Sequence, residues 1–280
     1  MRKASLAGLL ALLVPALPAL GDDWSRQYAL KGRPQLQVTT DDGSVRIETG
    51  DRTQIDARVT TTGWRISPGE VTITESQVGD RVTIEVRVPR NRWLMFGHRS
   101  ISVTLAVPRE ADVDVRTGDG SVNVQPINGR VSIVTGDGSI TAEGLHGNVR
   151  LRTGDGSIRA TGLEGRLDAG TGDGHMDVRG RFELLDLSTG DGGIAAEVER
   201  GSTMAGAWSL HSGDGGITLR LPDDLGAELD AHTGDGGISL DFPVTVAGSL
   251  SHSTVRAKLG AGGPPLRLRA GDGSIRLRRL

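Results

Sequence analysis

The chain has 280 residues, of which 42 are glycine and only 3% are aromatic, so its interior must consist of small and aliphatic side chains. A formal net charge of −3 gives no general argument for binding nucleic acid or an acidic membrane. The absence of cysteine excludes disulfides, thiolate metal sites and a cysteine nucleophile.

The first residues have the layout of a cleavable secretory signal. Arg2 and Lys3 form a short positive region, and an apolar run from Leu6 to Leu20 follows. Small residues before Asp22 predict cleavage after Gly21, so that residues 1–21 are removed. The run is shorter than the roughly 20 apolar residues that a membrane span needs. We therefore expect an exported mature chain without a transmembrane span.

Residues 22–115 alternate polar and apolar positions in an irregular way. Gly79-Asp80 separates two such stretches and indicates a hairpin. We expect a β-rich region that caps one end of the chain's repeats, because a terminal strand would otherwise expose unpaired backbone groups. The expected strands cover residues 54–61, 71–76, 81–88 and 100–107.

Four consecutive large apolar residues, Trp93, Leu94, Met95 and Phe96, lie among arginines in a predicted hairpin loop. Apolar patches with polar rims mark contact sites, so this loop could bind a membrane or a partner protein. Alternatively, Trp93 and Phe96 cover the end of the repeats as a hydrophobic cap. The sequence leaves both interpretations open.

From residue 116 to residue 280 a short motif recurs at regular intervals. Within each unit polar and apolar residues alternate with a period of two, which is typical of half-buried strands. A unit of 18 residues is too short to enclose its own core, so successive units must stack. The repeats therefore predict an all-β, parallel β-solenoid that is continuous with residues 22–115. Thr-Gly-Asp-Gly begins at Thr117, Thr135, Thr153, Thr171 and Thr189, and variants begin at Ser212, Thr233 and Ala270.

The glycines of these turns are expected to supply positive φ angles. We predict a positive φ for at least one of Gly154 and Gly156, which lie in the middle of the regular repeats. A β-branched residue would then strain the turn. The same change at Gly273, in the last turn of the sequence, is expected to cost less because only one neighbouring coil depends on it.

One aspartate per repeat forms a predicted ladder with a strand spacing of about 4.8 Å. Neighbouring carboxylates would repel each other by about 1 kcal/mol in water and by about 3.5 kcal/mol at an effective dielectric of 20. We favour a turn-forming role, in which the carboxylates accept backbone hydrogen bonds and no metal or other cofactor is bound. The alternative is a row of Ca²⁺ sites between coils. The residues are Asp119, Asp137, Asp155, Asp173 and Asp191.

Arginines alternate with leucine and isoleucine near the end of the sequence. The period of two places them on the solvent side of the last strands, where we expect a charged edge that prevents further stacking. A patch for anionic polysaccharide or lipid headgroups is the alternative. These residues are Arg267, Arg269, Arg276, Arg278 and Arg279.

Catalysis is not expected. Glycoside hydrolysis needs two carboxylates in different environments, whereas the repeated turns offer equivalent ones. The six histidines show no metal-ligand spacing. We therefore predict no catalytic residues.

Three elements together carry a resemblance: Val45 to Asp51 with the sequence VRIETGD, the segment AVPRE from Ala106 to Glu110, and the serial TGDGS[VI] motif. This combination resembles the bacterial putative-adhesin family of β-strand-repeat proteins, a domain family of unknown function, from about Gln35 to Arg278. The resemblance implies a right-handed β-solenoid that is exported to the cell envelope and has no catalytic residues.

These observations predict a non-catalytic binding scaffold or adhesin in the periplasm, at the cell surface or in the medium. Its partner would be an envelope or surface protein or polysaccharide, and not a nucleic acid. The alternatives are a carbohydrate-active β-helix enzyme, a Ca²⁺-binding solenoid and a self-assembling structural solenoid.

Overall fold

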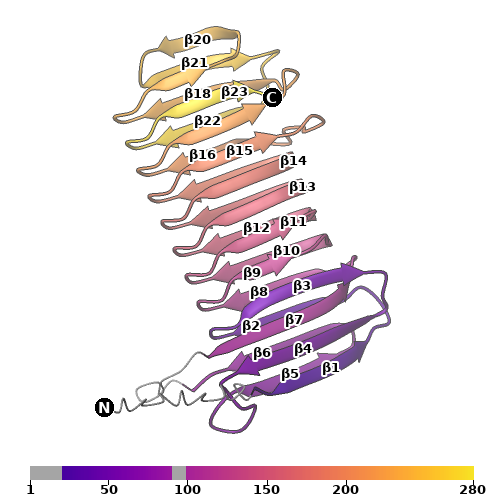
Figure 1. Ribbon diagram of the computed structural model, residues 1–280. Helices are drawn as coiled ribbons and strands as arrows, with labels where there is room; N and C mark the ends of the chain where they lie inside the picture. Colours follow the sequence, from indigo (N-terminus) through magenta and orange to yellow (C-terminus); the bar gives the residue numbers. More distant parts are fainter. Residues whose placement is uncertain (1–20, 90–98) are drawn as a thin grey trace, which may run out of the picture.

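The computed structural model describes residues 21–89 and 99–280, which form 23 β-strands and no helix (Figure 1). The predicted all-β class is therefore confirmed. The predicted signal segment, apart from Gly21, and the predicted contact residues Trp93, Leu94, Met95 and Phe96 lie outside the described residues.

The strands follow one another along the chain. The first seven are β1 (Asp23–Ala29), β2 (Gln35–Thr40), β3 (Ser44–Gly50), β4 (Gln54–Thr62), β5 (Thr72–Val78), β6 (Arg81–Arg87) and β7 (Ser100–Pro108). The next ten are β8 (Asp112–Thr117), β9 (Val122–Val124), β10 (Asn128–Thr135), β11 (Ile140–Glu143), β12 (His146–Thr153), β13 (Ile158–Thr171), β14 (Met176–Thr189), β15 (Ile194–Val198), β16 (Trp208–Ser212) and β17 (Ile217–Leu221). The last six are β18 (Ala227–Thr233), β19 (Ile238–Leu240), β20 (Val244–Leu250), β21 (Thr254–Leu259), β22 (Pro265–Ala270) and β23 (Ile275–Arg279).

Each repeat forms one coil that crosses two faces of the molecule. Val131 of β10 pairs in parallel with Val113 of β8 and with Val149 of β12, so neighbouring strands are offset by 18 residues. The first face contains β2, β6, β8, β10, β12, β16, β18 and β22, and the second face contains β3, β7, β9, β11, β15, β17, β19 and β23. The 14-residue strands β13 and β14 continue from the second face onto the first.

The core lies between the two faces and is made of stacked aliphatic rows. In most of the described strands alternate residues are buried, as in β8, where Val113 and Val115 point inward and Asp114 points outward. Because each coil repeats this pattern in register, equivalent side chains stack along the whole molecule. One such row contains Val113, Val131, Val149, Leu167 and Leu185.

The order of coils in space differs from their order in the sequence at both ends. Strand β2 lies between β6 and β8, and β22 lies between β16 and β18. The second face repeats this arrangement, with β3 between β7 and β9 and β23 between β17 and β19. The molecule therefore consists of an N-terminal block (residues 22–108), a regular array (residues 112–221) and a C-terminal block (residues 222–280).

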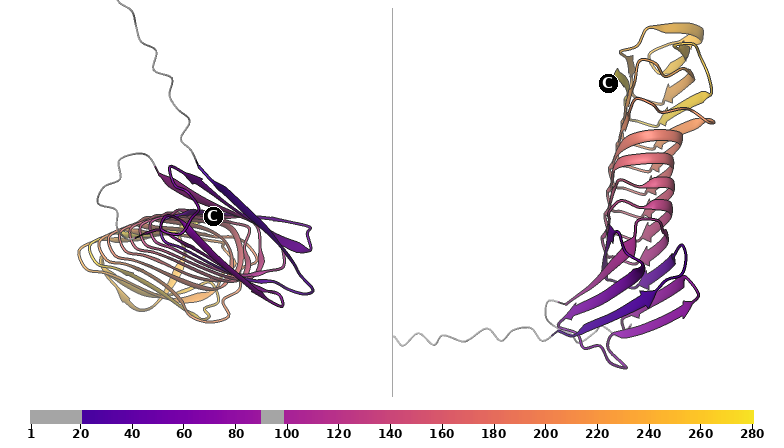
Figure 2. Two further views of the ribbon diagram at one scale, coloured as in Figure 1. Left: turned by 90° about the horizontal axis from the view of Figure 1, so that it is seen from below. Right: turned by 90° about the vertical axis from the view of Figure 1, so that its right-hand side faces the viewer.

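Antiparallel strands cover both ends of this rod. Strand β5 pairs with β6, and β4 and β1 extend the second face beyond β7. At the opposite end β21 pairs with β18, and β20 pairs with β21. Figure 2 shows the rod from the side, with the N-terminal strands at one end and the β20–β21 hairpin at the other.

The prediction that the last strands of the sequence form a charged edge of the rod is wrong. Arg267, Arg276 and Arg278 do face solvent, as the period of two predicts. However, they belong to β22 and β23, which are paired on both sides. The outermost coil is formed by β18 and β19, which come before β22 and β23 in the sequence. The turn motif of this coil is equivalent to that of the β22–β23 coil.

The prediction of positive φ at Gly154 or Gly156 is also wrong, because neither has a positive φ. A Cβ atom on Gly154 would lie 2.8 Å from the carbonyl oxygen of Gly136, and one on Gly156 would collide with the carbonyl of Gly138. These glycines are required because backbones of successive coils approach closely. Positive φ angles occur at the opposite edge of the coil, at Gly144, Gly147, Gly162 and Gly165.

Candidate functional site

The turns between the two faces are held by buried threonines. The Thr153 hydroxyl lies 2.8 Å from the carbonyl oxygen of Gly138 in the preceding coil, and it accepts a hydrogen bond from the backbone N–H of Gly156 at 3.2 Å. Thr135 and Thr171 make the same contacts one coil away on either side. Threonine therefore closes each turn and ties it to the coil before.

The predicted aspartate ladder lies on the solvent side of these turns. Its five carboxylates are exposed and make no hydrogen bond or ion pair within the part of the chain that the structure describes. The turn-forming role that we expected of them belongs to the threonines. The same part contains no group of three or more acidic or histidine side chains placed to hold a metal ion. Register alignment extends the row with Asp42, Asp214, Asp272 and Asp235.

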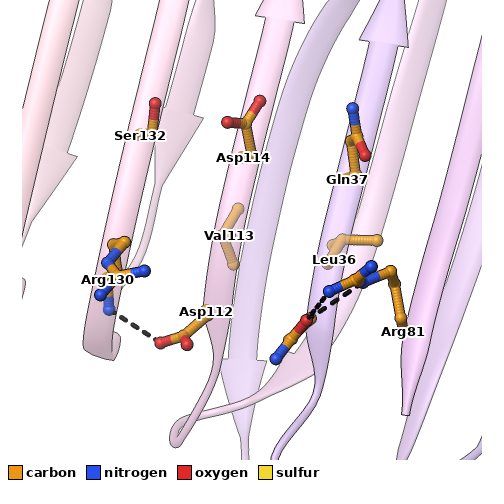
Figure 3. Close-up of a pocket in the computed structure, with 9 residues that line it drawn as sticks. Leu36, Gln37, Arg81, Asp112, Val113, Asp114, Arg130 and Ser132 are labelled. Carbon is orange, nitrogen blue, oxygen red and sulfur yellow. Dashed lines mark hydrogen bonds between the residues drawn. The ribbon is translucent and has the colours of Figure 1, made fainter. Parts of the chain in front are cut away.

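The first face has a hollow with a volume of about 380 Å³ where the N-terminal block meets the array (Figure 3). Strands β6, β2, β8 and β10 form it. At one end Arg81 donates to the side-chain oxygen of Gln35 from Nε at 3.1 Å and from Nη2 at 2.8 Å. At the other end Asp112 accepts a hydrogen bond from the backbone N–H of Arg130 at 3.0 Å. These contacts fix the walls of the hollow.

Several polar groups in the hollow have no partner among the described residues. They are the guanidinium of Arg130, the amide of Gln37 and the hydroxyl of Ser132. Asp114 Oδ1 is buried without a hydrogen bond, while Oδ2 lies 3.4 Å from Arg116. Such a set of free donors and acceptors on paired strands can bind a polar ligand through several hydrogen bonds at once. Sequence periodicity predicted that these side chains face outward, but not that they meet in one hollow.

A second hollow, of about 440 Å³, lies near the end of the second face. Its charged groups are already paired: Arg220 lies 3.3 Å from Glu197, and Arg278 lies 4.0 Å from Asp241. Because a ligand would have to displace these ion pairs, this hollow is the weaker candidate.

Two carboxylates on the first face have different environments. Asp168 and Asp186 pair in register on neighbouring strands. Asp168 forms ion pairs with Arg150 at 3.6 Å and with Arg152. Burial, followed by the nearby charge of Asp168, raises the pKa of Asp186. Both lie on an outward row, where Asp168 remains 40% exposed, so we assign the pair to the ion-pair network between coils.

The fold and these surfaces define a class: a rod of stacked β-coils with a filled interior and polar outer faces. Within this class, the chain belongs to the Toastrack DUF4097 family, whose model matches residues 33–278. This confirms the resemblance to a bacterial putative-adhesin family of unknown function. No curated protein matches the sequence. No helix of the described residues could cross a membrane.

Several solved structures are similar to the chain at low sequence identity. One is a putative cell adhesion protein from Clostridium sporogenes, with 13% identity, a TM-score of 0.31, and coverage of 93% of this chain and 100% of that one. A putative adhesin from Bacteroides fragilis has 9% identity, a TM-score of 0.44, and coverage of 95% and 100%. A putative lipid binding protein from Parabacteroides distasonis has 11% identity, a TM-score of 0.48, and coverage of 91% and 96%.

Proposed function

We propose that this protein is an exported, non-catalytic scaffold that binds a protein or polysaccharide of the cell envelope or surface. The observation that carries the proposal is the hollow over β6, β2, β8 and β10, with its unpartnered Arg130, Gln37 and Ser132. These groups stand on strands that are paired on both sides, so binding requires no ordering of the backbone, and the entropic cost is confined to the rotamers of the side chains. A mixed set of donors and acceptors suits a polar surface or a glycan.

Several finer features belong to the same proposal. Residues 22–280 form one continuous domain, with coils that are right-handed, as crossover connections between parallel strands almost always are. Residues 1–21 direct the chain out of the cytoplasm and are then removed after Gly21. Trp93 to Phe96 are a further candidate contact for the partner. The aspartate ladder remains a solvent-exposed edge without metal.

The export step is tested by cell fractionation of the native protein and by N-terminal sequencing of the mature form. We expect the protein in the periplasmic, surface or medium fraction, with a chain that starts at Asp22. A cytoplasmic protein that retains residues 1–21 would contradict the proposal.

The binding step is tested with fluorescently labelled mature protein on intact cells and on isolated envelope polysaccharide. The double variant Gln37→Ala/Arg130→Ala removes two hydrogen-bonding side chains, so we expect affinity to fall by at least about tenfold. The matched control is Arg46→Ala, which removes an exposed arginine from β3 on the second face. Equal affinity of all three proteins would rule out the hollow as the contact site.

A further inference from the structure

The junction between the array and the C-terminal block differs from the other junctions between coils. It is formed by β16 and β17 on the array side and by β22 and β23 on the block side. The chain crosses it in a short connection, residues 222–226, that leads into β18. The outermost coil does not touch the array by strand pairing, because β18 and β19 pair with β22 and β23 instead.

The C-terminal block is held together by its own side chains. Arg269 Nη2 lies 2.7 Å from Asp230 Oδ2 and Nη1 donates to the Asp230 carbonyl at 2.7 Å, which ties β22 to β18. The Thr233 hydroxyl donates to the carbonyl of Gly273 at 2.7 Å and joins the two turns. Strand β21 covers the outer side of β18. The block is therefore a connected unit of its own.

At the junction itself, no side-chain hydrogen bond or ion pair of the described residues joins residues 112–221 to residues 222–280. Within the array, a threonine or serine hydroxyl ties each turn to the one before, the last being Ser212 on the carbonyl of Gly192 at 2.8 Å. Ala270 occupies the equivalent place at the junction and has no hydroxyl. The missing hydrogen bond falls at the one boundary where the block meets the array.

Like charges face each other across the junction, as Asp168 and Asp186 also do inside the array. Arg220 and Arg278 are in register on the neighbouring strands β17 and β23. Arginines directly opposite each other destabilise strand pairing. Each finds its carboxylate on its own side, Arg220 with Glu197 in the array and Arg278 with Asp241 in the block. These ion pairs therefore stabilise the array and the C-terminal block separately and do not join them.

Among the described residues, the array and the C-terminal block are joined by backbone pairing and apolar packing. Trp208 stacks on Leu266, and Ile217 on Ile275, and all four side chains are fully buried. If the block separates, these side chains and two rows of unpaired strand edges are exposed on each part. A surface of matching register and pattern is needed to cover them. Every other copy of this chain carries such a surface.

We propose that the C-terminal block is exchangeable: the block of one molecule docks on the array of a second molecule, and residues 222–226 act as the hinge. The partner is a second copy of this chain, and reciprocal exchange gives a closed dimer that repeats the native contacts outside the hinge. The interaction is independent of what the protein binds at its faces.

The experiment uses the absence of natural cysteine. Ser209 and Arg267 are in register across the junction, so two cysteines there are close enough for a disulfide. One tagged mature chain carries Ser209→Cys, and a differently tagged chain carries Arg267→Cys. The two are unfolded together, refolded at high concentration and oxidised. We expect a disulfide-linked heterodimer.

The control pair is Ser132→Cys and Arg150→Cys, which are in register within the array. Exchange of the C-terminal block does not bring this pair together between molecules. We expect several-fold more heterodimer from the junction pair than from the control pair. Equal yields from pairs that have both refolded, as judged by circular dichroism, would overturn the proposal.

Two further measurements keep the test decisive. Ala270→Thr restores the missing hydroxyl, so exchange between native molecules must break one more hydrogen bond and should slow about fivefold. In the wild-type protein, hydrogen exchange should open the amides between β16 and β22 sooner than those between β10 and β12. Protection at the junction as strong as that inside the array would also overturn the proposal.

Discussion

At the residue scale, the repeat motif is explained by distances between coils. The backbone N–H of Gly154 donates to the carbonyl of Gly136 in the preceding coil at 2.5 Å, which leaves no room for a side chain on the turn. Threonine supplies the buried hydroxyl, and the aspartate faces solvent. The glycines of the motif are therefore explained by the close approach of neighbouring coils, and its threonine by the need for a buried hydrogen-bonding group.

Gly156→Ala should destabilise the protein by about 1–3 kcal/mol, because the new Cβ forces two coils apart. Gly50→Ala is the control, since its Cβ would meet only the Arg52 side chain at 3.6 Å. Chemical denaturation measures both. Gly273→Ala should cost about as much as Gly156→Ala, because its coil is paired on both sides and the Cβ would collide with Gly215. A neutral Gly156→Ala would contradict the close-approach explanation.

The sequence predicted that these positions must be glycine but assigned the wrong reason. Two glycines around an aspartate are typical of turns with positive φ. Neither Gly154 nor Gly156 has one, because the constraint comes from a neighbouring coil and not from the local backbone. A contact 18 residues away in the sequence is visible only after the stacking is known.

Asp230 provides a test through pH. The hydrogen bond from Arg269, together with the charges of Arg269 and Arg256, lowers the pKa of Asp230 from its usual value of 3.8. A carboxylate whose pKa is lowered by folding stabilises the folded state fully above its unfolded pKa. That stabilisation is lost as the pH falls through the lower, folded pKa. Asp230→Asn should therefore be less stable than wild type at pH 7, by a margin that disappears in strong acid.

The measurement is urea denaturation at neutral pH and again at low pH. Asp241→Asn is the control, because Asp241 is 57% exposed and lies 4.0 Å from Arg278. Exposed ion pairs of this kind contribute about 0–1 kcal/mol. If the difference in unfolding free energy between wild type and Asp230→Asn does not change with pH, the asparagine side chain destabilises the protein sterically and not through the lost charge.

At the element scale, the strands were predictable and their order was not. The period of two and the 18-residue interval predict the parallel pairing of β8, β10 and β12. The turns at Ser212, Thr233 and Ala270 are nearly equivalent, so any stacking order of the last three coils satisfies the motif. The β20–β21 hairpin, which covers β18, fixes the observed order. The hollow on the first face was not predictable either, because it joins strands β6 and β10 that are far apart in the sequence.

The row of turn aspartates should be independent of metal. Removing Ca²⁺ with a chelator should leave the melting temperature unchanged, because each exposed carboxylate tolerates a neighbour about 4.8 Å away at a cost of about 1 kcal/mol in water. A bound ion at a hundred times its dissociation constant would contribute about 2.7 kcal/mol, or about 5–10 °C. Asp155→Asn should maintain or raise stability. A large drop with the chelator would contradict the metal-free interpretation of the aspartate ladder.

At the scale of the whole molecule, the strand edges at the two ends decide whether rods add to one another end to end. Strand β5 forms the N-terminal edge of the first face and has no strand partner beyond β6 in the described chain. Glu75 of β5 accepts hydrogen bonds from Arg26 at 3.0 Å and from the hydroxyl of Tyr28, which is buried. Both partners belong to β1, so this carboxylate joins the edges of the two faces.

Glu75→Val should make the N-terminal end associate with other molecules. An inward charge on an edge strand is a common way to prevent a further strand from adding, and valine at this position would complete an apolar surface beside a free edge. Ser76→Val is the matched control, because it adds the same side chain to the outward side of the same strand. Sedimentation velocity over a range of concentrations should show dimers or larger species for Glu75→Val. The Ser76→Val protein should sediment like wild type. If the two variants associate equally, exposed apolar area and not the inward charge controls assembly at this end.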